Sequence, residues 1–109
     1  MLFFLRPIEN INVKTLIHFK NAKNISTKNV APGDLIHIGN EHILIVYKVS
    51  GNNIQIAHSS EKNLAVTTSK IFINNSVKSL GQQKWEDKYY RQKFLANPNS
   101  GIKRLIRWL

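Results

Sequence analysis

Cysteine is absent from the 109-residue chain, and this absence excludes several chemistries at once. A disulfide framework, a zinc or iron–sulfur site with thiolate ligands and a thiol nucleophile all require cysteine. The absence says nothing about compartment, because a cysteine-free chain suits both oxidising and reducing surroundings.

Long hydrophobic runs are also missing. The apolar residues 2–5 are followed at once by Arg6 and Pro7. A signal peptide needs an apolar stretch of about 7–15 residues, and a membrane span needs about 20. We therefore expect neither in this chain, and its localisation is not indicated.

Acidic residues are scarce: 6 Asp and Glu stand against 16 Lys and Arg, for a net charge of +10. The excess lies at the two ends, with +4 over residues 1–29 and +7 over 70–109, whereas residues 30–69 carry −1. Such a balance favours binding to nucleic acid or to an anionic surface. The many Lys, Asn and Ile residues, typical of an AT-rich genome, offer a second explanation of the same charge.

The length predicts one domain. We divide it into an N-terminal helix and loop segment (1–29), a core of strands (30–75) and a basic, aromatic, helical tail (76–109). The fold class expected from this order is α+β, with a small antiparallel sheet and one or two packed helices.

β-branched and aromatic residues predict a run of short strands in the middle of the chain. The strongest strand, 42–49, is apolar on both faces over its first half, as is typical of a central strand. Turn residues at 31–34, 39–40 and 50–53 separate the strands. The expected strands are 35–38, 42–49, 54–58, 64–68 and 70–73, with a break near Ser69.

Helical spacing is found towards both ends of the chain. In the tail, Trp85 and Tyr89, and then Tyr90 and Phe94, are each four residues apart, which predicts an amphipathic helix over 82–96. The remaining expectations are a helix near 7–17, a loop over 20–29 and a strand or short helix over 102–109.

The four histidines lack the spacing of a zinc helix, and no carboxylate cluster accompanies them. We therefore expect no metal site and no cofactor. His42 and His58 are set apart, because they open and close a predicted hairpin. A three-residue turn at 50–52 would place both imidazoles on one face of the sheet, and a four-residue turn would place them on opposite faces.

Three short motifs resemble the second half of an NlpC-type papain-like cysteine peptidase. They are Pro-Gly-Asp-Leu-Ile at 32–36, His-Ile-Leu-Ile-Val-Tyr at 42–47 and Ile-Ala-His-Ser at 56–59. The resemblance implies the β half of a papain-like fold. It implies that His42 is the general base, that His58 orients it, and that Asp34 and Tyr47 lie near the ligand. The implied partner is a peptidoglycan peptide or another acyl-amide substrate.

The chain departs from that family in having no cysteine to serve as nucleophile. Three interpretations remain open: the chain is a piece of a longer protein, it is a degenerate paralogue kept for binding, or the resemblance is accidental. In each case we expect no peptidase or amidase activity from this chain alone, because an imidazole without a positioned nucleophile loses the covalent route.

The alternative function is nucleic-acid binding by the basic tail, in which aromatic residues alternate with cations. The candidate contacts are Lys84, Lys88, Arg91, Arg104 and Arg107. The competing structural interpretation is that the aromatic residues pack in the core and the lysines only face solvent.

Overall fold

A computed structural model provides the structure of the chain and describes residues 18, 21–60 and 65–106. In this part the chain forms a seven-stranded antiparallel sheet and one α-helix, which confirms the α+β class. The spatial order of the strands is β1-β7-β2-β3-β4-β5-β6. The elements are β1 (Ala22–Asn24), η2 (Thr27–Asn29), β2 (Leu35–Ile38), β3 (His42–Ser50), β4 (Asn53–Ser60), β5 (Ala65–Phe72), η3 (Leu80–Gln82), β6 (Lys84–Trp85), α2 (Lys88–Ala96) and β7 (Ser100–Leu105).

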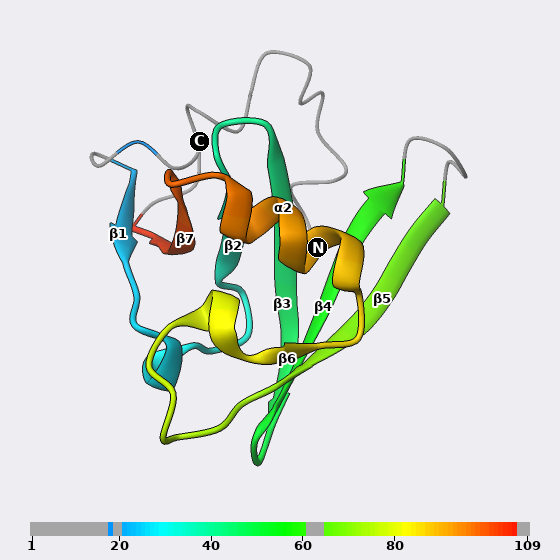
Figure 1. The fold of residues 1–109 in the computed structure, drawn as a ribbon. Coiled ribbons are helices and arrows are strands. Elements are labelled where there is room, and N and C mark those ends of the chain that lie inside the picture. The colour runs from blue at the N-terminus through cyan, green and yellow to red at the C-terminus, as the bar shows by residue number, and fades with distance from the viewer. Residues whose placement is uncertain (1–17, 19–20, 61–64, 107–109) are drawn as a thin grey trace.

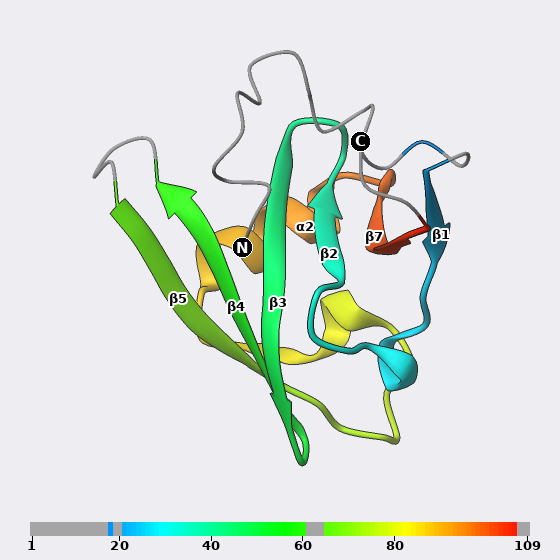
Figure 2. The same ribbon diagram turned by 180° about the vertical axis from the view of Figure 1, so that it is seen from behind.

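The helix α2 lies across one face of the sheet, in front of β2, β3 and β4 in Figure 1. Figure 2 shows the same strands from behind, with α2 on the far side. The core fills the space between these two layers because alternate residues of each strand point to one face. Its buried members are Ile36, Ile38, Leu44, Val46, Ile54, Ile56, Ile71, Leu80, Trp85, Phe94 and Ile102.

The central strands agree closely with the sequence-based prediction. β2 has the predicted bounds, β3 is one residue longer than predicted, and β4 extends beyond 54–58 at both ends. The turn between β2 and β3 uses Gly39 with a φ of +57°, where a Cβ atom would collide with the side-chain amide of Asn97. Glycine is therefore required at this turn by both its backbone conformation and its neighbour.

The prediction of two short strands around Ser69 is wrong. β5 is one continuous strand of eight residues, and Ser69 forms an ordinary pair with Ile56. The polar residues 67–70 weaken the local strand pattern, but β4 offers a hydrogen-bonding partner along the whole length of β5. Tertiary pairing thus overrides the local propensity.

The predicted helix over 82–96 is also wrong in its first part. Trp85 belongs to β6, where it pairs with Ile71 of β5. The helix begins only at Lys88, because the side chain of Asp87 accepts a hydrogen bond from the backbone N–H of Tyr90 at 3.1 Å. This is the geometry of an N-cap, and the cap fixes the start of α2.

The two ends of the described chain meet in the sheet. The predicted loop over 20–29 contains β1 and η2, and β1 pairs with β7. β7 also pairs with β2, which resolves the open choice for residues 102–109 as a strand over their described part. The helix expected near 7–17 lies outside the described residues. No helix within 18, 21–60 and 65–106 is long and apolar enough to cross a membrane.

Candidate functional site

The hairpin of β3 and β4 decides which residues share a face. Ser50 pairs with Asn53, so the turn has two residues, Gly51 and Asn52, instead of the three expected. Near this turn Lys48 lies opposite Gln55 and not opposite Ile54 as predicted. The register then shifts between Val46 and Lys48. Beyond this β-bulge the predicted register is found, with Val46 opposite Ile56.

The imidazoles of His42 and His58 lie side by side, which confirms that they share one face. Their ring centroids are 5.3 Å apart and their planes meet at 77°, an edge-to-face arrangement. His58 alternates with the buried Ile54 and Ile56 along β4, so this face is the one that carries the core. The pair sits on neighbouring strands in the centre of the sheet.

Tyr90 of α2 completes the cluster, and the sequence analysis did not include it in the site. Its ring stacks on His42 with centroids 4.8 Å apart and planes within 7°. It also meets His58 edge to face at 4.5 Å. The spacing of Tyr90 and Phe94 correctly predicts that both face the sheet, and only the three-dimensional structure shows that the histidines lie beneath Tyr90. We call His42, His58 and Tyr90 the histidine–tyrosine cluster.

Within this cluster the two imidazoles have different environments. His58 is 7% exposed, and neither of its ring nitrogens has a hydrogen-bond partner among the described residues. His42 is only partly buried. A base and its orienter are normally joined by a hydrogen bond from a ring nitrogen of the base. Here the two rings contact each other edge to face and that bond is not made.

No metal-binding group of three or more His, Cys, Asp or Glu residues is found among the described residues. The other two histidines lie outside the cluster. His18 is exposed. His37 is buried, its Nδ1 donates to the carbonyl of Gly39 at 3.1 Å, and burial lowers the pKa of its imidazole.

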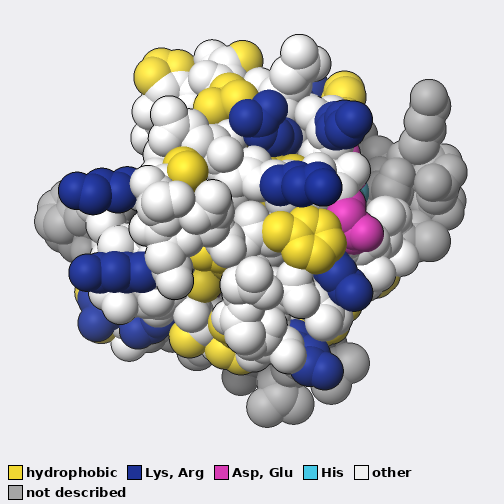
Figure 3. Space-filling view, turned by 60° about the horizontal axis from the view of Figure 1, so that its bottom comes forward, with side chains coloured by type: hydrophobic (Ala, Val, Ile, Leu, Met, Phe, Trp, Pro, Cys, Tyr) yellow, Lys and Arg dark blue, Asp and Glu magenta, His cyan; other side chains and the backbone are white. Residues whose placement is uncertain are grey.

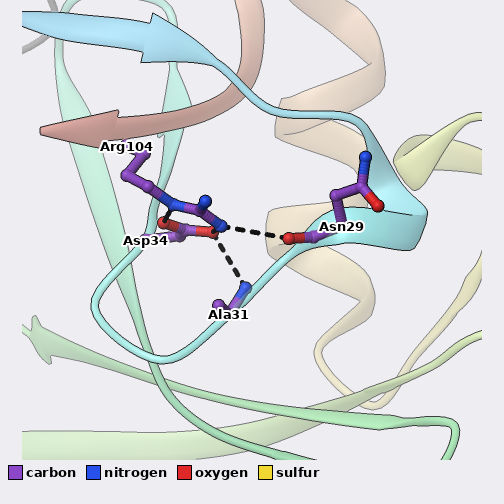
Figure 4. A network of polar contacts seen from close by, with 4 residues as sticks. All are labelled: Asn29, Ala31, Asp34 and Arg104. Carbon is purple, nitrogen blue, oxygen red and sulfur yellow. Dashed lines mark hydrogen bonds and ion pairs between the residues drawn. The ribbon is translucent and has the colours of Figure 1, made fainter. Parts of the chain in front are cut away.

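Asp34, a candidate ligand contact, is used inside the fold (Figure 4). It is 1% exposed. Its Oδ1 accepts from Nε of Arg104 at 2.8 Å, and its Oδ2 accepts from Nη2 of Arg104 at 2.9 Å. Oδ2 also accepts from the backbone N–H of Ala31 at 2.9 Å. Both carboxylate oxygens therefore hold the turn before β2 against β7.

The same ion pair engages Arg104, a candidate nucleic-acid contact. Besides binding Asp34, its Nη2 donates to the carbonyl oxygen of Asn29 at 3.0 Å. The hydrogen bonds to Asp34 raise the pKa of the guanidinium group. A planar guanidinium that binds a carboxylate through two nitrogens is strongly oriented, so Arg104 serves the fold first.

Tyr47, the other candidate ligand contact, lies away from the histidine–tyrosine cluster. Its ring is 45% exposed, and its hydroxyl donates to Oε1 of Gln55 at 2.9 Å. Gln55 stands between Ile54 and Ile56 on β4, both of which point into the core, so the Gln55 side chain lies on the opposite face. The structure therefore does not bring Tyr47 to the imidazoles.

Three of the five basic candidates line one surface groove. Lys84 of β6 and Lys88 and Arg91 of α2 surround a hollow of about 750 Å³. Trp85 and Tyr89 contribute to the same wall, together with glutamines. Figure 3 shows an exposed hydrophobic ring with Lys and Arg side chains around it and acidic side-chain atoms directly beside it. Arg107, the last candidate, lies outside the described residues.

The structure thus presents two separate features: a largely buried cluster of two imidazoles and a phenol, and an open groove lined by cations. Comparisons of the chain with protein-family models, with curated proteins and with solved structures find no match.

Proposed function

We propose that this chain is an NlpC-like cell-wall peptidase or amidase domain without a nucleophile, which binds peptidoglycan peptides and does not cleave them. The observation that carries the proposal is the contact between His42 and His58, whose ring centroids are 5.3 Å apart. The resemblance in sequence assigns these two residues the roles of base and orienter. The two imidazoles are brought together by the pairing of β3 with β4 in one hairpin.

The chemistry of the histidine–tyrosine cluster supports binding more than turnover. A peptidase of this type uses the imidazole to activate a thiol, and the sequence contains none. The imidazole of His58 offers a hydrogen-bond donor and an acceptor to peptide amides and carboxylates. His58 has both ring nitrogens without partners in the described structure, and a buried polar group in that state gains from a ligand that supplies one.

Binding and turnover are tested with soluble stem peptides released from peptidoglycan. We expect mass spectrometry to show intact peptide after long incubation, while the ring-proton NMR signals of His42 and His58 shift on titration. The variant His58→Gln keeps a polar side chain and is expected to weaken binding by about two- to tenfold, the range of one or two hydrogen bonds.

The matched control is Lys48→Gln, which changes an exposed side chain on the same hairpin. It is expected to leave the binding curve unchanged. Hydrolysis that disappears in His42→Ala would show that the chain holds another nucleophile and would contradict the non-catalytic assignment. Unmoved histidine signals at saturating peptide would contradict the binding role.

A further inference from the structure

The groove between β6 and α2 is separate from the histidine–tyrosine cluster in its residues and its chemistry. Its charged lining residues are Lys84, Lys88 and Arg91, and all three are cations. We infer that this groove binds single-stranded nucleic acid, with its cations on the phosphates and one base stacked on Tyr89. This second activity does not depend on the proposed function.

The nearby acidic residues lie outside the lining of the groove. Glu86 follows Trp85 in the chain, but its Oε1 accepts the backbone N–H of Lys70 at 2.7 Å, on the neighbouring strand. Asp87 caps α2 through the backbone N–H of Tyr90. Neither carboxylate lines the groove. Glu86 and Asp87 keep their charge, so residues 84–91 carry a net +1, but the side chains that a phosphate backbone would contact in the groove are all cations.

Tyr89 adds an exposed aromatic ring to the cations of the groove. Its ring is 61% exposed, whereas Trp85, four residues before it, is 3% exposed. Tyr89 is nevertheless held in place, because Tyr90 meets it edge to face at 5.1 Å and the ammonium group of Lys93 lies 5.2 Å from its ring centre. An exposed but supported aromatic ring beside a row of cations is the arrangement on which unpaired bases stack.

The same ring distinguishes the class of ligand. Bases in a duplex already stack on each other and do not offer a free face to a side chain, so Tyr89 favours a single strand. An acidic peptide would satisfy the cations but has no flat ring to place on Tyr89. Arg91 is partly fixed by the bond from its Nε to the carbonyl of Gln83 at 3.2 Å, so its remaining guanidinium nitrogens are oriented before binding.

The test is fluorescence anisotropy with a short labelled oligothymidylate, titrated at several salt concentrations. Three phosphate contacts predict a log–log salt slope of about −2 for a single strand. The double variant Lys84→Gln with Lys88→Gln should reduce the magnitude of that slope by about 1.4. The matched control Lys23→Gln with Lys28→Gln removes the same charge from exposed positions on β1 and η2 and should leave the slope unchanged.

The stacking contact is tested with Tyr89→Leu, which keeps an apolar side chain at an exposed position. We expect binding of the oligothymidylate to weaken at least fivefold, roughly the lower limit for loss of one base–aromatic stack. Binding of inorganic polyphosphate, which has no bases, should not change in this variant.

Three results would overturn the inference: no binding at low salt, tighter binding to a duplex of the same length, or equal behaviour of oligothymidylate and polyphosphate in every variant. The last result would show an anion-binding surface without base stacking. None of these experiments involves His42 or His58, so failure here and failure of the peptide-binding proposal are distinguishable.

Discussion

Replacing Trp85 tests whether the tail of the chain is part of the fold. The ring is 3% exposed, and its centroid lies 5.5 Å from that of Phe94 of α2. Its Nε1 donates to the carbonyl oxygen of Leu80 at 3.0 Å. Emptying such a site costs about 3–5 kcal/mol, so we expect Trp85→Ala to lower the free energy of unfolding by that amount. This is a large share of the roughly 5–15 kcal/mol that stabilises a typical domain.

Two further variants separate the sources of this loss. Trp85→Phe keeps an aromatic ring and removes the indole hydrogen bond; because the Leu80 carbonyl still accepts from the backbone N–H of Gln83, we expect a loss of only about 0.5–1.5 kcal/mol. Tyr89→Ala removes an exposed ring from the neighbouring helix and should change stability by less than about 1 kcal/mol. Urea denaturation followed by far-UV circular dichroism measures all three. A Trp85→Ala protein within about 1 kcal/mol of the wild type would refute the buried position of this ring.

Two more predictions concern buried polar groups. Burial lowers the pKa of His37, so the unfolded chain binds its proton at a higher pH than the folded chain does. Stability should therefore fall as the pH drops below about 6.5 and through the folded pKa, and His37→Gln should flatten this dependence in urea titrations at several pH values. Asp34→Asn should lower the melting temperature because it leaves Arg104 without its counter-charge. The control Glu41→Gln, at an exposed position, should not lower it. Equal melting temperatures of Asp34→Asn and the wild type would contradict the structural role of the ion pair.

The strands in the centre of the sheet were predictable because their residues carry the pattern by themselves. β2 and β3 consist mainly of β-branched and other apolar residues bounded by turns, and both are found within one residue of the predicted bounds. The strands at the sheet margins gave no such pattern. β1 has three residues, Ala-Lys-Asn, and is a strand because β7, about 80 residues later, pairs with it. Pairing over that distance leaves no mark on the local sequence.

The tail shows why the spacing of aromatic residues alone was not sufficient to predict where α2 begins. Trp85 and Tyr89 are four residues apart, which suits one face of a helix, yet they lie on different elements and in opposite environments. The deciding residue was Asp87, whose side chain caps α2 and separates the strand before it from the helix after it. An aspartate directly before a run of helix-forming residues is a start signal that the sequence did contain.

The meeting of His42 and His58 depends on the β-bulge. With a two-residue turn and no bulge, strict alternation would place the two imidazoles on opposite faces. The packing gives the reason for the extra residue: Val46 and Val49 both pack towards the core although they are an odd number of positions apart. Only an additional residue between them allows both to face inward.

Tyr47 lies within this irregular step, between Val46 and Lys48, and both it and Lys48 are exposed. It occupies the register shift, and its hydroxyl donates to Oε1 of Gln55 on the face opposite the histidine–tyrosine cluster. The interpretation of Tyr47 as a ligand contact came from the resemblance to NlpC-type peptidases and not from the alternation of side chains along β3. The bulge leaves Tyr47 and Lys48 exposed in succession, while Val46 and Val49 on either side of them pack towards the core.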